Sequence, residues 1–435
     1  MSVVAIGGLA AFSIIGLSFI GVPVGVAIAL TAAAGMYLVS GPDFMLVMFQ
    51  TIPLATAAEY SFVVVPTFIL MGNIASVSGM IEAIFKSAAK WLSTTHGGLF
   101  YAVTVASAGF AAVSGSTVVN AAAFSRMALP HMRQLGYDKG LSAGCIAAAG
   151  TFAVMIPPSL GFVIYGILTE ESVGRLFVAG LIPGIVTVLG YFLALKVLLR
   201  FKPDLAPQVD ELISRRERLL SLRPLWSFGL LVIVILGGIY AGLFSPSAAG
   251  SIGATGAIVI ALSQRRLTWK SFAESAVETA KLTASIFFIV IAGFIFARFL
   301  ITSGFIPELV GVLTDVGIGK YQFLAILVVL YLVLGMFIDG ASMAVITLPF
   351  VYPISQQLGI DGIWLGVLFV KMVEIGAITP PMGINLYAAL AASQGQLKLT
   401  EIIQGVVPFV ILELAILLLL ILVPQLSLYL PSTMG

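Results

Sequence analysis

Residues 374–387 read EIGAITPPMGINLY, and residues 149–162 read AGTFAVMIPPSLGF. Each stretch places a Pro-Pro pair, at 157–158 and at 380–381, inside a long apolar run. Proline removes a backbone amide and clashes with the carbonyl four residues earlier, so each pair is expected to break a membrane helix. Two breaks in matching surroundings indicate two related halves rather than two accidental kinks.

The two stretches belong to an internal repeat. Pro158 and Pro381 are 223 residues apart, and the same offset relates Pro130 to Pro353. It also relates the pentapeptide QLGYD, which begins at Gln134, to QLGID later in the chain. Matches at one spacing without a gap predict one supersecondary arrangement used twice.

The second copy is expected to be inverted in the membrane. Three apolar spans (225–243, 247–263 and 279–300) separate the copies, and an odd number of crossings reverses the orientation. Inverted repeats are typical of secondary transporters, which bind their substrate near the bilayer midplane between the repeats.

Composition independently points to the membrane. The 435-residue chain is 60% hydrophobic and only 9% charged, whereas soluble domains carry about 25% charged residues. The formal net charge of +2 forms no basic face that would suit nucleic acid. The single cysteine, Cys145, excludes an intramolecular disulfide.

We therefore predict an all-α polytopic membrane protein. Two stretches, 114–130 and 338–353, are too polar for ordinary spans and are expected to be re-entrant hairpins. The expected apolar segments are 3–20, 22–40, 61–79, 97–113, 139–168, 178–200, 225–243, 247–263, 279–300, 321–337, 362–390 and 403–430. The expected organisation is 1–96 (N-terminal scaffold helices), 97–200 (first repeat), 201–319 (cytoplasmic segment and central scaffold helices) and 320–435 (second repeat).

The distribution of Lys and Arg predicts the orientation. Basic residues concentrate in 80–96, 126–139, 200–224 and 265–270, which places these loops in the cytoplasm. Segment 205–223, which includes Asp210 and Glu211, reads either as an amphipathic interfacial helix or as a solvated linker.

Polar residues gather at the hairpins and at the broken helices. Unwound carbonyls and hydroxyls suit a hard cation such as Na⁺, and helix N-termini suit a carboxylate. We expect one ion site per repeat, with an organic anion between them. The expected substrate-binding residues are Ser114, Gly115, Asn120, Ser159, Asp339, Gly340 and Asn385.

Three intramembrane charges have two interpretations each. Asp339 is either an ion or substrate neighbour or a helix N-cap. Lys371 and Glu374 lie three residues apart on one predicted helix, and we interpret them as a structural pair rather than as a functional site.

The sequence offers no arrangement for covalent catalysis. His96 and His131 lie at segment ends, and neither belongs to a metal-ligand spacing or to a Ser-His-Asp set. We expect no enzyme activity and no organic cofactor.

These motifs resemble the large membrane subunit (M subunit, DctM-like) of the TRAP transporters, the tripartite ATP-independent periplasmic carriers of the ion-transporter superfamily. The resemblance covers nearly the whole chain. The matching stretches are 114–130, 136–183, 237–250 and 335–431, including GMFIDGAS, EIGAITPPMGINLY and PQLSLYLP. Two residues depart from the family pattern: Ala248, usually acidic, and Lys371, usually uncharged.

The resemblance implies an elevator-type transporter in a bacterial inner membrane, driven by a Na⁺ gradient. It implies import of an organic acid such as a C4-dicarboxylate, another carboxylate or a sialic acid. Two partners are implied: a small four-helix membrane subunit (Q subunit) as a separate chain, and a periplasmic substrate-binding protein (P subunit).

Sodium ligands, largely backbone carbonyls, are implied by the same resemblance. In the second repeat they fall on Gly335, Gly376, Thr379 and Met382. In the first repeat they fall on Ser116, Gly150, Thr151 and Pro157.

Two other functions remain open from the sequence. A stand-alone Na⁺/dicarboxylate symporter of the same superfamily would share the fold without the partners. A membrane scaffold or embedded enzyme would need a polar catalytic cluster or large soluble loops, and the longest polar loop is 200–224.

Overall fold

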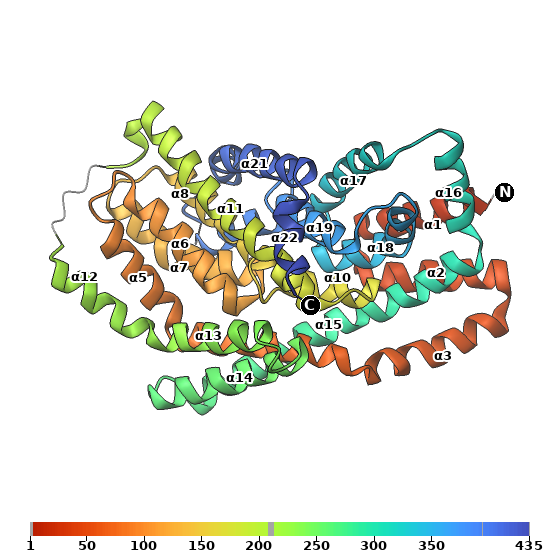
Figure 1. Ribbon diagram of the computed structural model, residues 1–435, viewed down its shortest axis with the longest axis horizontal. Helices are drawn as coiled ribbons and strands as arrows, with labels where there is room; N and C mark the ends of the chain where they lie inside the picture. The colour runs from red at the N-terminus through yellow and green to blue at the C-terminus, as the bar shows by residue number, and fades with distance from the viewer. Residues whose placement is uncertain (1–2, 208–212, 394, 435) are drawn as a thin grey trace.

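The computed structural model describes residues 3–207, 213–393 and 395–434, and every regular element in these ranges is a helix (Figure 1). Six of the described helices are long and apolar enough to cross a membrane. A seventh span results if Lys139–Met155 and Leu160–Thr169, which meet at a 40° bend, count as one. The chain is therefore a multi-pass helical membrane protein.

The helices fall into two matching series. The first series comprises α1 (Val3–Phe19), α2 (Val24–Ser40), α3 (Pro42–Ala58), α4 (Val64–Val77), α5 (Met80–Leu92), α6 (Gly98–Ser114), α7 (Thr117–Gln134), α8 (Lys139–Ala149), α9 (Phe152–Met155), α10 (Leu160–Thr169) and α11 (Val173–Phe201). The second comprises α13 (Trp226–Tyr240), α14 (Pro246–Ser263), α15 (Trp269–Thr302), α16 (Phe305–Asp315), α17 (Lys320–Gly335), α18 (Gly340–Gln357), α19 (Gly362–Gly376), α20 (Ile384–Ala392) and α21 (Leu399–Leu422). Helix α12 (Arg215–Leu222) lies between the series, and α22 (Gln425–Ser432) follows the second.

Equivalent residues begin equivalent helices. The Asp138 side chain caps α8, and Asp361, at the repeat offset, caps α19. Both Pro-Pro peptide bonds, 157–158 and 380–381, are cis. An N-cap acceptor satisfies amides that the first helical turn leaves free, so the shared aspartate starts the same helix twice.

Helices of each series pack on helices of the other series, and equivalent helices make equivalent contacts. Helix α2 packs on α15, and its counterpart α14 packs on α4. Likewise α7 packs on α20, and α18 packs on α10. Each series therefore buries its helices against the other, and neither forms a separate domain.

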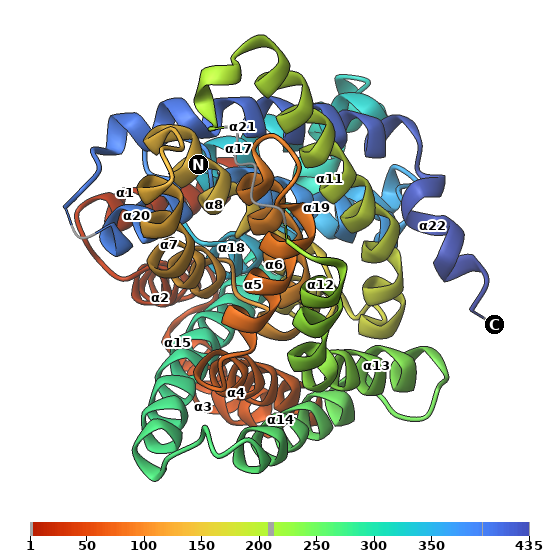
Figure 2. The ribbon, with the colours of Figure 1, turned by 90° about the vertical axis from the view of Figure 1, so that its left-hand side faces the viewer.

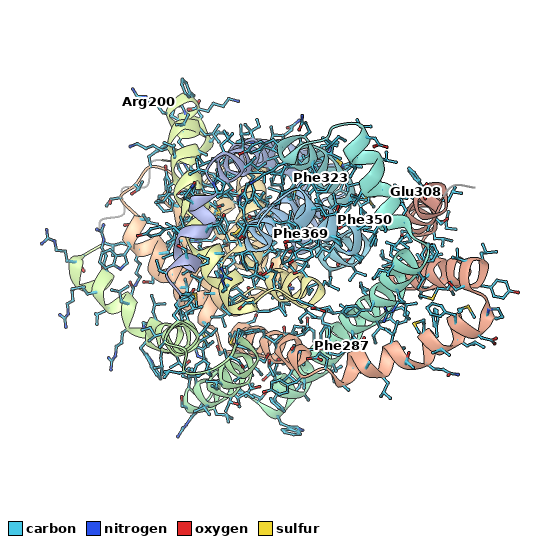
Figure 3. All side chains as sticks on the ribbon, turned by 45° about the vertical axis from the view of Figure 1, so that its right-hand side comes forward. Arg200, Phe287, Glu308, Phe323, Phe350 and Phe369 are labelled. Carbon is cyan, nitrogen blue, oxygen red and sulfur yellow. The ribbon has the colours of Figure 1, made fainter. Side chains whose placement is uncertain are left out.

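Two spatial groups result from this packing. In Figure 2 helices α3, α4, α13, α14 and α15 gather in what we call the lower layer. Helices α6, α7, α8, α11 and α17–α21 lie above it, and α9 and α10 pack on members of this group, so α6–α11 and α17–α21 together form the upper block. Figure 3 shows Arg200 and Glu308 at the periphery, whereas Phe369 lies inside the upper block.

Glycines allow α8 and α21 to pack closely in the upper block. A Cβ at Gly144 of α8 would lie 2.2 Å from the carbonyl carbon of Gly405 in α21. A Cβ at Gly405 would lie 1.9 Å from the oxygen of Gly140. Small residues permit such backbone approach between membrane helices, and here they join the first series to the second.

Several helices differ from the sequence prediction. Helices α3, α5 and α16 were not among the predicted segments. In α5 and α16 the apolar residues cover one face rather than a continuous run. Helix α15 begins at Trp269, ten residues before the predicted span, since Thr268 and Ser271 form a capping box there. In segment 205–223 the structure shows α12, while Asp210 and Glu211 lie outside the described residues.

Candidate substrate and ion site

Two helix–helix breaks face one cavity. Helix α6 ends at Ser114 and α7 begins at Thr117, with the Ser116 side chain accepting the Val119 amide at 3.5 Å. At the equivalent position of the second series, Asp339 Oδ1 accepts the amides of Ala341 and Ser342, at 3.0 and 3.1 Å. Asp339 is therefore the N-cap of α18, one of the two roles predicted for it.

The cavity has a volume of about 190 Å³ and joins parts of both series. It is lined by the two breaks and by the ends of neighbouring helices. Its lining includes Gly115, Ser116, Leu160, Ile286, Asp339, Gly340, Phe369, Val373 and Ala377. Three of the predicted substrate residues, Gly115, Asp339 and Gly340, thus meet in one place, together with Ser116.

The remaining predicted substrate residues lie outside this lining. Ser159 caps α10, which begins at Leu160. The Asn120 side-chain amide donates to Ser107 O at 3.1 Å, and that of Asn385 donates to Ala147 O at 3.1 Å. Ser114 is buried beside the first break. Sequence reasoning grouped these residues by polarity, but helical geometry points them into the protein rather than into the cavity.

Three of these side chains keep an unused oxygen. Ser114 Oγ, Asn120 Oδ1 and Asn385 Oδ1 are buried and have no hydrogen-bond partner among the described residues. An unpaired buried acceptor costs free energy, so such oxygens suit a cation. The residues around the breaks are therefore compatible with Na⁺.

The sodium residues predicted in the second repeat converge at two helix ends. Helix α17 ends at Gly335 and α19 ends at Gly376. A Cβ on either glycine would lie 2.7 Å from the Cα of the other. The last carbonyls of a helix lack intrahelical partners and carry partial negative charge, so two such ends together favour a cation.

The other two members of this set lie in the break that follows α19. Thr379 Oγ1 donates to Ile375 O at 2.6 Å, and the Thr379 amide donates to Gly376 O at 3.1 Å. Met382 is half exposed. The turn around Thr379 thus uses part of the hydrogen-bonding capacity that the prediction assigned to the ion.

The sodium residues predicted in the first repeat are more dispersed than those of the second repeat. A Cβ at Gly150 would lie 2.8 Å from the Cβ of Ala121, which places α7 against the start of the break. Pro157 precedes the cis bond, and Ser116 lines the cavity. Thr151 Oγ1 lies 2.7 Å from Ala148 O and 2.9 Å from Glu374 Oε1. The Thr151 hydroxyl is therefore engaged with a carboxylate of the second series.

The contact between Thr151 and Glu374 shows how the two halves are related in space. Thr151 and Glu374 are 223 residues apart and so occupy equivalent positions of the repeat. Equivalent positions in two copies can touch only near the axis that relates the copies. The two broken helices therefore meet back to back at this point.

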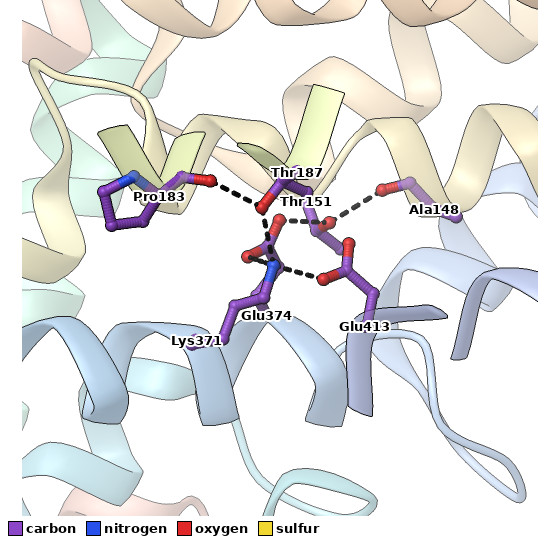
Figure 4. A network of polar contacts seen from close by, with 7 residues as sticks. All are labelled: Ala148, Thr151, Pro183, Thr187, Lys371, Glu374 and Glu413. Carbon is purple, nitrogen blue, oxygen red and sulfur yellow. Dashed lines mark hydrogen bonds and ion pairs between the residues drawn. The ribbon is translucent and has the colours of Figure 1, made fainter. Parts of the chain in front are cut away.

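A fully buried charge network surrounds Glu374 (Figure 4). Lys371 Nζ lies 3.0 Å from Glu374 Oε2, which confirms the predicted contact between these two residues. Lys371 also forms an ion pair with Glu413 of α21 and donates to Thr187 Oγ1 of α11 at 2.9 Å. The Lys371 and Glu413 side chains are 0% exposed.

Sequence reasoning missed Glu413. The available signal was a single carboxylate in the otherwise apolar segment 403–430. Intramembrane charges usually indicate function or a buried partner, and the partner here lies on another helix.

A helical membrane permease built from two matching halves around one cavity is the class that this fold and site define. The fold resembles that of the Alcanivorax borkumensis YdaH transporter, with a TM-score of 0.64. That match covers 88% of this chain and 90% of the other chain at 15% identity, which shows similarity of fold alone.

Residues 11–426 match the family model described as the tripartite ATP-independent periplasmic transporter, DctM component. The C4-dicarboxylate TRAP transporter large permease protein DctM of Pseudomonas aeruginosa is 33% identical over 87% of this chain and 88% of its own. The 2,3-diketo-L-gulonate TRAP transporter large permease protein YiaN of Escherichia coli is 31% identical over 94% of each. The sialic acid TRAP transporter large permease protein SiaM of Vibrio cholerae is 28% identical over 97% of each.

The chain belongs to the DctM-component family, the large permeases of TRAP transporters. It is accordingly a transporter permease rather than an enzyme.

Proposed function

We propose that this chain is the large permease subunit of a Na⁺-coupled TRAP transporter that imports a small organic acid. The observation that supports this most is the cavity shared by the breaks at Ser116 and Asp339. Helices α7, α10 and α18 all begin at or beside it, and their N-termini favour an anion.

Sodium is the proposed coupling ion. The converging ends of α17 and α19 offer carbonyl oxygens at Gly335 and Gly376. The unused oxygens of Asn120 and Asn385 lie on α7 and α20, which pack on each other. Carbonyl and amide oxygens are the ligands that hard cations prefer.

The proposed motion is that of an elevator. The cavity lies where the upper block meets the lower layer, because Ile286 of α15 lines it together with residues of α10, α18 and α19. In the proposed mechanism the two re-entrant hairpins, α6–α7 and α17–α18, carry substrate and Na⁺ past the lower layer.

The proposed partners follow from the family. TRAP large permeases work with a small membrane subunit and a periplasmic binding protein. We propose a separate four-helix Q subunit and a P subunit in this case, with the chain in the bacterial cytoplasmic membrane. The relatives' names include a C4-dicarboxylate, a diketogulonate and a sialic acid, so the proposed substrate class is the carboxylates.

Reconstitution in proteoliposomes tests the proposal. We expect uptake of the acid bound by the P subunit only when the permease, the Q subunit, the loaded P subunit and an inward Na⁺ gradient are all present. Flux with the permease alone would instead support the stand-alone symporter. Flux that does not depend on the Na⁺ gradient would refute coupling to Na⁺.

The same assay tests the sodium residues. Thr379→Ala removes a hydroxyl at the second break, and we expect it to raise the Na⁺ concentration needed for half-maximal uptake. Thr302→Ala, on the exposed end of α15, is the matched control and should leave Na⁺ activation unchanged. Identical Na⁺ curves for both variants would contradict the assignment of Thr379.

A further inference from the structure

The charge network around Lys371 does not line the cavity, and the proposed function leaves it unused. Its ammonium meets three oxygens: Thr187 Oγ1 at 2.9 Å, Glu374 Oε2 at 3.0 Å and Glu413 Oε2 (Figure 4). A lysine ammonium has three donors, so Lys371 is fully satisfied. These partners come from α11, α19 and α21.

The network is not electrically balanced. One ammonium and two carboxylates leave a net charge of −1 if both acids are ionised. An uncompensated charge in the protein interior is costly, and the bilayer removes bulk water as a source of compensation. A buried group of this kind requires another positive charge or a bound proton.

Two buried atoms without hydrogen-bond partners indicate that the charge imbalance lies at Glu413. Glu413 Oε1 and the Tyr191 hydroxyl are buried, and neither has a hydrogen-bond partner among the described residues. The Tyr191 hydroxyl faces Glu413 from α11. The Tyr191 ring stacks on Phe409, one helical turn before Glu413 on α21, at a centroid distance of 5.0 Å, which fixes its position.

Apart from Lys371 and Glu374, no charged side chain among the described residues lies beside Glu413 and Tyr191. Helices α8, α11, α19 and α20 pack on α21. From α8 the only ionisable neighbour is the Cys145 thiol, from α19 come Lys371 and Glu374, and Tyr387 of α20 is exposed. The remaining charged residues of these helices are exposed: Lys139, Arg175, Lys196 and Arg200. On α21 itself, Glu401 accepts the Lys398 amide at the start of the helix.

The number of free oxygens distinguishes a proton from a metal ion. Hard cations in proteins take roughly six oxygen ligands, whereas Glu413 Oε1 and Tyr191 Oη are the two that the network leaves unused, since Glu413 Oε2 pairs with Lys371. A proton needs one carboxylate oxygen to hold it and one acceptor to share it. A protonated Glu413 would donate to Tyr191 Oη and leave a neutral network.

We propose that Glu413 is a proton-binding site, shared with Tyr191, and that its proton crosses the membrane with the upper block. Water on the outer side supplies the proton, which forms an O–H bond with the carboxylate. Water on the inner side takes it back, so no other reactant is needed. The transport step rests on the proposed function, whereas the proton site does not.

Infrared spectroscopy of the purified full-length chain with its small subunit tests the site without transport. We expect a carboxylic-acid C=O stretch at neutral pH that shifts in D₂O and is lost in Glu413→Gln. Glutamine has the shape of the protonated acid, so this variant should fold. Glu308→Gln, on the exposed face of α16, is the control and should keep the band.

The infrared result is decisive in either direction. A band that persists in Glu413→Gln, or one that is missing in the wild type from mildly acidic to alkaline pH, overturns the site. Tyr191→Phe should retain the band but shift its frequency, because the proton loses its hydrogen-bond partner.

Proteoliposomes containing a pH-sensitive dye test the movement. We expect Na⁺-driven uptake to acidify the lumen in the wild type, and we expect this acidification to be lost in Glu413→Gln. Uptake without acidification would overturn proton movement while leaving the proposed function intact. Absence of all uptake would overturn the proposed function and, with it, proton movement, while the infrared band still decides the site.

Discussion

At the scale of single residues, Lys371 explains how two acids are tolerated within the membrane. Its ammonium bridges Glu374 of its own helix and Glu413 of α21, and it also holds Thr187. Paired buried charges are weak evidence for net stability, because desolvation offsets their attraction. Removing one partner is much more costly, since it leaves the other charges unpaired.

Lys371→Met should therefore be strongly destabilising. It leaves the fully buried Glu374 carboxylate without a cation, and loss of one partner of a buried pair costs about 3–5 kcal/mol. Thermal unfolding of the purified protein measures the effect. Lys398→Met, at an exposed position, should change stability by less than about 0.5 kcal/mol.

A double variant distinguishes charge from packing. Lys371→Met combined with Glu374→Gln removes the carboxylate that is left unpaired, so it should unfold at a higher temperature than Lys371→Met alone. Equal stabilities would show that the lysine stem, rather than its charge, is what the site needs.

At the scale of elements, the ends of α17 and α19 form a junction that admits only glycine. Gly335 and Gly376 approach so closely that a methyl group on either would lie 2.7 Å from the Cα of the other. The two residues are about 40 positions apart in sequence, and their helices are connected through the whole of α18. The contact brings two carbonyl ends together where the proposed Na⁺ site lies.

Gly335→Ala should disturb this junction. Overpacking typically costs about 1–3 kcal/mol, and separation of the two helix ends should also raise the Na⁺ concentration needed for uptake. Gly229→Ala is the control, because a Cβ at this position of α13 meets no atom within 4 Å. It should be neutral or slightly stabilising, by up to about 1 kcal/mol. A Gly335→Ala protein with wild-type stability and wild-type Na⁺ activation would contradict the proposed role of the junction.

At the scale of the whole molecule, the lower layer and the upper block share a boundary at the cavity. Ile286 of α15 and Met343 of α18 both line it, although they belong to different groups. In an elevator these residues must separate, whereas contacts within the upper block persist throughout the cycle.

Cross-linking tests this difference in a background where Cys145 is replaced by Ser. A short bifunctional thiol reagent joining Ile286→Cys to Met343→Cys should nearly abolish uptake, and reductive cleavage of the linker should restore it. Glu171→Cys with Tyr352→Cys is the control, since these side chains touch within the upper block, with Tyr352 Oη 2.8 Å from Glu171 Oε1. Uptake that survives the first cross-link would refute sliding at this boundary.

The sequence by itself determined the class of protein and much of its local geometry. Its low charge content required a membrane, and the offset between Pro158 and Pro381 revealed two copies of one helix series. The breaks and caps could also be predicted, because proline and aspartate act on the backbone within one helical turn. Asp339 is an example, since the N-cap role, one of the two interpretations of this residue, appears in the structure.

Only the tertiary structure decided which polar residues meet. Asn120 and Asn385 looked like cavity residues, yet their side-chain amides hold backbone carbonyls within the packed upper block. Glu413 joined Lys371 across two helices that are separated in sequence, and no local pattern encodes that pairing. The physical reason is that residue spacing fixes only the face of a helix, whereas helix packing fixes which faces touch.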